Sequence, residues 1–239
     1  CCSPDVLLGN VSQSFLASFK KPADTAQFNR VTAYSDPYQF DGEQYDFIAE
    51  LNYKFGWGTL TSTTSLDHFE FRSNFDSEQT ALTLAQFKDR QESDAFAQEV
   101  RLTSDSNGNF NWMAGAYYYD NDFVRGSLDP NKPMFVLGPD IGPAPQPGAA
   151  GDKAMYRSSN DTRHWSVFAQ GDWQLAPRYV FSAGAHFIDE TKTIETRSAL
   201  QVLALPSLAT ALGSPLPINA ERSTDGVAWN ASLRFDATD

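Results

Sequence analysis

Three histidines are the first side chains in this sequence that could hold a metal ion, namely His68, His164 and His186. They lie far apart in the sequence, and none belongs to a zinc-binding helix motif. The chain also lacks a serine nucleophile elbow, a phosphate-binding loop and a dinucleotide fingerprint. We therefore expect ordinary polar roles for the histidines, no cofactor and no enzymatic activity.

A short acidic and amide segment superficially resembles the start of a calcium-binding loop. It consists of Asp105, Asn107 and Asn109. A calcium-binding loop also requires a glycine at its sixth position and a distal glutamate, and both are missing here. Asn107 is followed directly by Gly108, a pair typical of tight hairpin turns. The sequence therefore favours a plain turn here.

The elements that position the polar residues are best seen at residues 45–55. Tyr45, Phe47 and Leu51 fall on one face of an extended chain, whereas Glu50 and Lys54 fall on the other. Strands of soluble sheets are usually about five or six residues long. A longer alternating strand with aromatic ends is typical of a transmembrane β-strand, whose apolar face meets lipid and whose polar face meets a wet lumen.

The same alternation recurs along the chain. It predicts strands at residues 45–55, 59–72, 96–104, 111–123, 162–175, 179–191 and 227–235, and a weak one at 11–19. Short turns alternate with long connections at 20–42, 73–93, 124–161 and 195–225. The connection at 73–93 contains a possible short helix around Leu82, Leu84 and Phe87. We predict an all-β fold, an antiparallel transmembrane β-barrel segment of about 7–8 strands with short periplasmic turns and long extracellular loops.

Composition limits the possible partners. The formal net charge of −12 argues against nucleic acid, which requires a basic surface. The mean hydropathy of −0.42 is compatible with a barrel, because only alternate strand residues face lipid. Cys1 and Cys2 are the only cysteines and cannot form a disulfide framework.

Several polar and aromatic side chains are candidates for a ligand path. They are Glu50, Lys54, Glu99, Arg101, Tyr117, Tyr119, Trp165 and His186, with Tyr156 as a further ring near the rim. The alternative is that the charged residues line the wall as hydrated groups, since charge facing lipid costs roughly 2–4 kcal/mol, and that the rings belong to an aromatic girdle. Three acids near an outward strand end could either hold a divalent ion at the level of lipopolysaccharide or remain solvated, namely Asp120, Asp122 and Asp129.

The paired segments 98–104 (QEVRLTS) and 111–118 (NWMAGAYY), with 58–65 (GTLTSTTS) before them, form an ordered series of motifs. This series resembles the middle barrel region of TonB-dependent outer-membrane receptors, in which 58–65 corresponds to the strand before the pair. Three later segments resemble successive later hairpins of that family, namely 167–173 (VFAQGDW), 183–187 (AGAHF) and 229–235 (WNASLRF). His186 stands where the family usually carries arginine.

The resemblance implies that the parent protein imports a scarce ligand, such as an iron–siderophore, a vitamin or a glycan, across the outer membrane of a Gram-negative bacterium. The implied partners are outer-membrane lipid and lipopolysaccharide, the receptor's own plug domain and, through it, TonB. We expect residues 1–43 to form a weak first strand and a long loop, and residues 44–239 to form a fragment of a larger barrel.

Two other architectures fit parts of the pattern. A free-standing eight-stranded barrel, acting as an adhesin or narrow pore, would require residues 11–19 to pair with residues 227–235. A secreted glycan-binding β-sandwich would require the apolar faces to meet in a dry core between two sheets.

Overall fold

The computed structural model describes residues 38–76, 85–105, 108–137, 151–201 and 217–237. Every regular element in these ranges is a β-strand, and none of their residues forms a helix that could cross a membrane. The strands are β1 (Gln39–Lys54), β2 (Gly58–Asp76), β3 (Ala85–Ser104), β4 (Phe110–Ser127), β5 (Phe135–Leu137), β6 (Lys153–Ala176), β7 (Tyr179–Gln201) and β8 (Ile218–Phe235).

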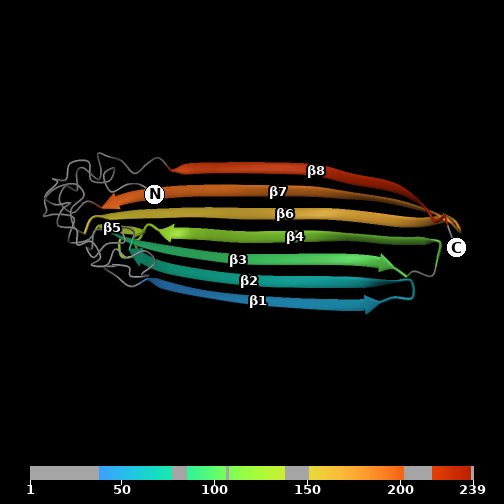
Figure 1. Ribbon diagram of the computed structural model, residues 1–239, viewed down its shortest axis with the longest axis horizontal. Coiled ribbons are helices and arrows are strands. Elements are labelled where there is room, and N and C mark those ends of the chain that lie inside the picture. The colour runs from blue at the N-terminus through green and yellow to red at the C-terminus, as the bar shows by residue number, and fades with distance from the viewer. Residues whose placement is uncertain (1–37, 77–84, 106–107, 138–150, 202–216, 238–239) are drawn as a thin grey trace, which may run out of the picture.

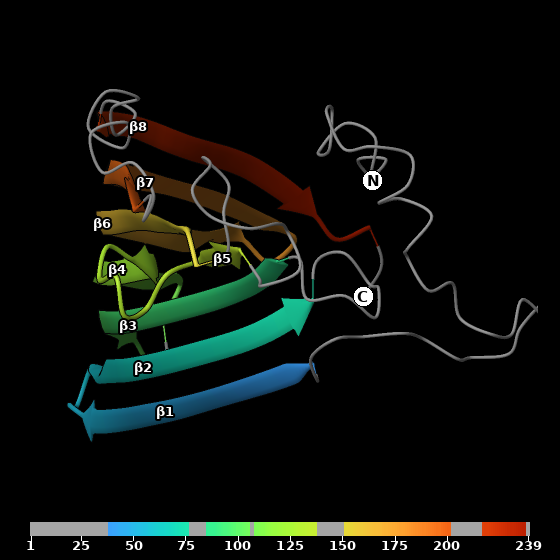
Figure 2. The same cartoon turned by 90° about the vertical axis from the view of Figure 1, so that its left-hand side faces the viewer.

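The strands form one antiparallel sheet in the order β1-β2-β3-β4-β6-β7-β8. Apart from the short β5, which pairs with β3 and β6, strands that follow each other in the sequence lie side by side (Figure 1). Seen along the strands, the sheet curves from β1 to β8 (Figure 2). Within the described residues β1 and β8 each pair on one side only. The predicted fold class is confirmed, and the single layer shows that the sandwich alternative is wrong.

The strands are longer than the alternation predicted, and the connections are correspondingly shorter. β3 begins at Ala85, β7 continues to Gln201 and β8 begins at Ile218, so much of the expected loops at 73–93 and 195–225 is strand. The expected loop at 20–42 also overlaps the start of β1. The reason is physical: the backbone ladder needs only hydrogen-bonding partners, so it continues where the apolar alternation stops.

The prolines of residues 124–161 predicted one irregular segment, and this prediction is wrong. β4 continues to Ser127, β5 lies within the segment, and β6 begins at Lys153. The expected short helix is wrong at Phe87, which pairs with Phe75 in the β2–β3 ladder. Leu82, Leu84 and the weak strand at 11–19 lie outside the described residues, so the eight-stranded alternative and the division at residue 43 remain predictions.

The two faces of the sheet differ in accessibility. In β6 the side chains of Trp165 and Val167 are each 45% exposed, whereas Ser166 between them is 2% exposed. Side chains spread apart on the convex side of a curved sheet and crowd together on the concave side. The face with Trp165 and Val167 is therefore the convex face, and the face with Ser166 is the concave face.

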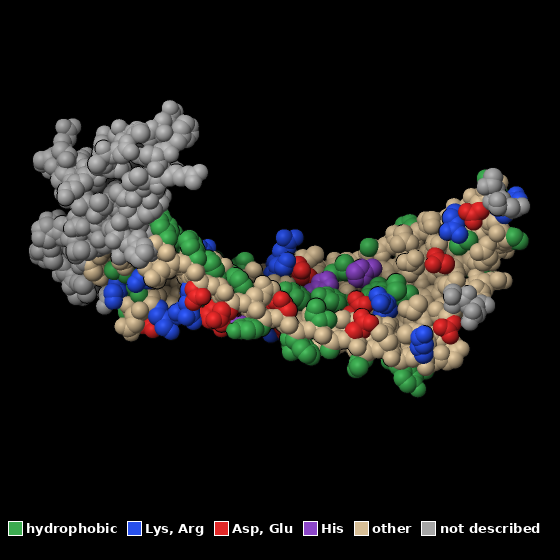
Figure 3. Space-filling view, turned by 60° about the horizontal axis from the view of Figure 1, so that its bottom comes forward, with side chains coloured by type: hydrophobic (Ala, Val, Ile, Leu, Met, Phe, Trp, Pro, Cys, Tyr) green, Lys and Arg blue, Asp and Glu red, His purple; other side chains and the backbone are tan. Residues whose placement is uncertain are grey.

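The convex face carries an apolar band at the end of the sheet that bears the short turns. Across the ladder, Val100, Ala116, Val167, Phe187 and Val227 occupy one row of this band. A series of aromatic rings borders it near the turns, including Trp57 and Trp112 with centroids 6.2 Å apart, and Tyr179 and Phe235 at 4.9 Å. We call this part of the sheet the turn half, and the remainder, toward the long connections, the loop half. Apolar and charged side chains are interspersed along the curved surface in Figure 3.

Candidate functional site

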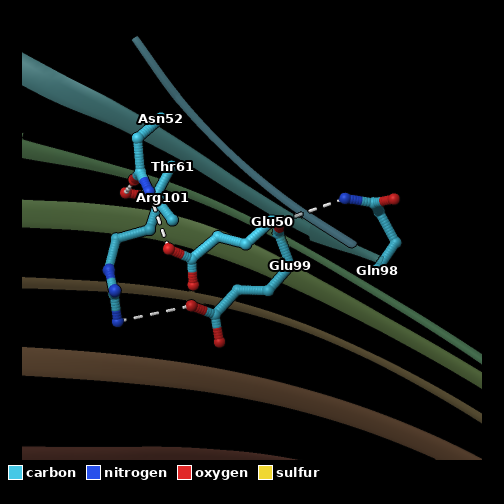
Figure 4. Close-up of polar contacts among 6 residues, drawn as sticks. All are labelled: Glu50, Asn52, Thr61, Gln98, Glu99 and Arg101. Carbon is cyan, nitrogen blue, oxygen red and sulfur yellow. Dashed lines mark hydrogen bonds and ion pairs between the residues drawn. The ribbon is translucent and has the colours of Figure 1, made fainter. Parts of the chain in front are cut away.

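A hydrogen-bonded group of polar side chains lies on the concave face of β1, β2 and β3 in the turn half. Asn52 donates to the carboxylate of Glu50 over 2.6 Å and accepts from the Thr61 hydroxyl over 2.6 Å. Arg101 lies opposite Thr61 and is 3.5 Å from the Glu99 carboxylate. Figure 4 shows these side chains together, with Gln98 extending in another direction. The predicted wall residues Glu50, Glu99 and Arg101 are therefore brought together.

Lys54 and His186 lie on the same face but apart from this group. Lys54 is opposite Thr59 at the end of β1, and the described residues include no ion pair to its amine. His186 lies opposite Phe168, whose ring is 6.0 Å from the imidazole in an edge-on arrangement. Phe168 in turn covers Gly115, where a Cβ would be 2.5 Å from the ring. This aromatic–glycine pair separates His186 from Arg101.

Tyr117 and Tyr119 line a shallow hollow of about 490 Å³ farther along the concave face. His164 also lines it, and its ring is 5.7 Å from that of Tyr117. Glu190 and Lys192 complete the charged part of the lining and are 3.0 Å apart. The hollow therefore presents rings beside a paired acid and base.

Sequence reasoning missed the contribution of His164, Glu190 and Lys192 to this hollow. The predicted strand at 179–191 ended one residue before Lys192, so the lysine was not assigned to the strand. A usable signal was present, because Glu190 and Lys192 have the same parity as His186 along β7. Extending the alternation past the apolar residues would have placed both on the concave face.

Trp165 lies on the opposite face of the sheet from the other candidates for the ligand path. It shares the convex face with Val167, and its ring lies 5.1 Å from Phe187. This placement on the opposite face from the other candidates favours the girdle alternative, and both remain predictions. Tyr156, by contrast, has the same strand parity as Ser166 and lies opposite Ser198.

The three histidines are not brought together. His68 is on the convex face, where its Nδ1 lies 2.7 Å from Asp94, whereas His164 and His186 are on the concave face. Asp120 also lies on the convex face, 3.6 Å from Arg163, and accepts a hydrogen bond from Tyr118. Among the described residues there is no group of three or more His, Cys, Asp or Glu side chains that could hold a metal ion.

One ion pair on the concave face of the loop half is partly buried. Arg125 donates to Asp89 over 2.9 Å, and Gln91 donates to the same carboxylate over 2.9 Å. The hydrogen bond to Asp89 raises the pKa of the Arg125 guanidinium above its usual value. The pair therefore remains charged and joins β3 to β4 beyond the apolar band.

Comparison with known proteins shows the family of this chain. The sequence model described as "TonB dependent receptor-like, beta-barrel" matches residues 5–239. The chain belongs to this family. None of the curated proteins compared with the chain matches it.

A solved structure supports the same fold. It is the ferric yersiniabactin uptake receptor FyuA from Yersinia pestis, with a TM-score of 0.58 and 11% sequence identity. The match covers 84% of this chain and 27% of that receptor. The TonB-dependent receptor chain described here thus spans about a quarter of the length of the solved receptor.

Proposed function

We propose that the chain forms part of the barrel wall of a TonB-dependent transporter in the outer membrane of a Gram-negative bacterium. The observation that carries the proposal is the sidedness of the sheet in a member of this family. In the turn half an exposed apolar band lies on the convex face, while paired charges and hydroxyl groups line the concave face. A lipid-facing surface backed by a wet lumen requires this arrangement.

The concave face is proposed to meet the plug domain and the passing ligand. Its charges occur as neighbouring pairs of opposite sign, such as Glu99 with Arg101 and Glu190 with Lys192. Such pairs offer hydrogen-bond donors and acceptors but produce only a weak local electrostatic field. The plug domain or a ligand can therefore move past them through a layer of water. Tyr117 and Tyr119 add large contact areas at a low cost in side-chain entropy.

A ferric siderophore is the ligand class to test first, ahead of vitamins and glycans. The similar solved receptor is named for ferric yersiniabactin uptake, and this supports the choice by analogy of fold. The hollow beside Tyr117 and His164, of about 490 Å³, is of a size that suits a small organic chelate. Energy for release into the periplasm would come from the inner membrane through TonB.

Uptake by whole cells tests the proposal. Deleting the gene should abolish accumulation of one radiolabelled ferric siderophore, and the full-length gene should restore it. The double substitution Tyr117→Ala/Tyr119→Ala should reduce apparent affinity about tenfold if the two rings contact the ligand. Tyr118→Ala is the matched control, because Tyr118 lies between them in the sequence but on the convex face.

Unchanged accumulation of ferric siderophores, cobalamin and glycans in the deletion strain would overturn the transport proposal. A loss in the deletion strain with equal affinity in the double variant and the Tyr118→Ala control would retain transport and remove the two tyrosines from the ligand path.

A further inference from the structure

A line of polar side chains crosses the apolar band on the convex face. It runs from Ser62 on β2 through Gln98 on β3 to Asp120 on β4, and each step moves one strand across and two residues toward the long connections. We call these three residues the polar seam. Thr64, opposite Gln98, lies beside it. The next parallel line carries larger apolar or aromatic side chains, namely Leu60, Val100 and Tyr118.

The polar seam runs along the membrane normal. The ladder row that contains Tyr45 reaches β8 at Glu221, whereas the apolar band on β8 begins six residues later, at Val227. Six residues over six strand spacings give a slope of about 35°, which matches the tilt of strands in membrane barrels. A line that moves two residues along a strand for each strand crossed makes about the same angle with the strands. The seam therefore crosses the band from the turn side toward the loop side.

The side chains of the seam do not satisfy one another completely. The Thr64 hydroxyl donates to Oε1 of Gln98 over 2.6 Å, and Nε2 of Gln98 donates to the Ser62 hydroxyl over 3.0 Å and to the Glu99 carbonyl over 3.1 Å. Figure 4 shows Gln98 turned away from the polar group of the concave face. The Ser62 proton has no acceptor in the described part of the chain, and Oε1 of Gln98 keeps a second lone pair. One donor and one acceptor are thus left on the convex face.

The outer end of the seam carries an ion pair between two strands. Oδ2 of Asp120 is 3.6 Å from Nε of Arg163 and accepts a hydrogen bond from Tyr118. The other carboxylate oxygen has no partner within the described ranges, and the Arg163 side chain is 73% exposed. Asp120 and Arg163 are directly opposite in the ladder, so they lie side by side at a similar height. Asp161 is the next position on the line and lies beyond the band, where water and salt screen its charge.

Lipid chains offer no hydrogen-bonding group to the polar seam, so a seam that faces lipid is unfavourable. A protein surface removes this penalty, and polar side chains hold membrane segments together in this way. We propose that the polar seam is the contact surface for a second copy of this chain. The proposal rests on the outer-membrane location proposed above.

A second copy fits because the polar seam is complementary to itself. A two-fold axis along the membrane normal places the seam of one copy against the same line of the other. The amide end of Gln98 lies beside Ser62, so the free Ser62 proton of each copy reaches the free lone pair of Gln98 on the other. Asp120 and Arg163 lie on either side of the axis, so each meets its opposite charge across the contact.

The test uses the full-length receptor in the outer membranes of intact cells. Benzoylphenylalanine, a photoreactive amino acid, is placed at Val100 beside the seam or, as the matched control, at Val227 in the band on β8. Irradiation should give a covalent homodimer from position 100 and little or none from position 227. Mass spectrometry of the product identifies both chains.

Removal of the shared amide should weaken the contact. Gln98→Leu, combined with the probe at position 100, should lower the yield of homodimer roughly threefold. Gln170→Leu makes the same substitution on the concave face and should leave the yield unchanged. Leucine suits a lipid-facing position, and heat-dependent migration in gels checks that both variants are folded.

A charge exchange separates contacts between copies from contacts within one copy. Asp120→Arg alone and Arg163→Asp alone should each weaken the homodimer, because like charges then meet across the axis. The two variants expressed together should form a mixed dimer, because each new charge meets an opposite charge on the other copy. This rescue cannot arise within one copy, where both side chains then carry the same charge.

Three results would overturn the proposal: no product from position 100, equal yields from positions 100 and 227, or a product that contains a different protein. Equal losses in Gln98→Leu and Gln170→Leu would overturn it too, as would a mixed dimer no stronger than the homodimers of the two charge variants.

Ligand uptake is a separate readout. Gln98→Leu should leave uptake unchanged, because the polar seam is on the opposite face from the proposed ligand path. A receptor that imports its ligand but gives no homodimer would refute the seam alone. A homodimer in cells whose uptake does not depend on the receptor would refute transport alone.

Discussion

The turn half and the loop half of this sheet share the same backbone ladder but differ in their side chains. In the turn half of β6, Trp165 and Val167 face outward while Ser166 faces inward. In the loop half of the same strand, Ser158 and Ser159 are neighbours on opposite faces. Alternation therefore reports a difference between the two surrounding media, whereas strand formation requires only that the backbone finds partners.

The strongest test of this comparison places a positive charge on the convex face of each half. Val167→Lys should destabilise the folded receptor by roughly 2–4 kcal/mol, because the ammonium would face lipid near the middle of the band. Thr193→Lys, opposite Asp161 and Glu221 in the loop half, should be neutral or slightly stabilising.

Guanidinium unfolding of the receptor in lipid vesicles measures both changes. Equal effects of the two lysines would show that the band does not face lipid, and the distinction between the halves would fail.

A smaller effect is expected from packing within the concave wall. At Gly115 an added Cβ would be 2.8 Å from the carbonyl oxygen of Val100 and would also meet the Phe168 ring. Gly115→Ala should therefore cost about 1–3 kcal/mol as an overpacking change. At Gly226 a Cβ has no neighbour within 4 Å, so Gly226→Ala is the matched control and should have little effect.

The same unfolding measurement compares these two variants. A neutral Gly115→Ala would mean that Phe168 does not cover the glycine, and the separation of His186 from Arg101 would lose its basis.

The smallest effect is expected at Asn52. Asn52→Ala removes hydrogen bonds to Glu50 and Thr61, but water can replace them on a wet wall, so the loss should be about 0.5–1 kcal/mol. Thermal unfolding followed by gel migration would detect a larger change. A loss above about 2 kcal/mol would indicate that this wall is dry, as for a buried polar group left without its partner.

The sequence was sufficient for the fold class and for the alternating part of each long strand. The sequence also indicates on which face of the sheet Trp165 lies, because Trp165 alternates in step with the apolar residues Val167 and Ala169. The ends of the strands could not be predicted, because no change of solvent marks them.

Contacts between strands were harder to predict than the strands themselves. The pairing of Arg72 with Arg90 depends on the register of β2 against β3, and alternation does not fix the register where both faces meet water. The hollow around Tyr117 depends in the same way on the continuation of β7 to Lys192.

The interruption between β4 and β5 has a consequence for how this protein can change. Ser127 pairs with Tyr156 and Phe135 pairs with Ala154, so the ladder of β6 passes from one segment to the other across Met155 alone. Residues can be added between them without shifting any pair before or after the break. Evolution, or an engineer inserting an epitope for surface display, can lengthen the chain here while the rest of the wall keeps its register.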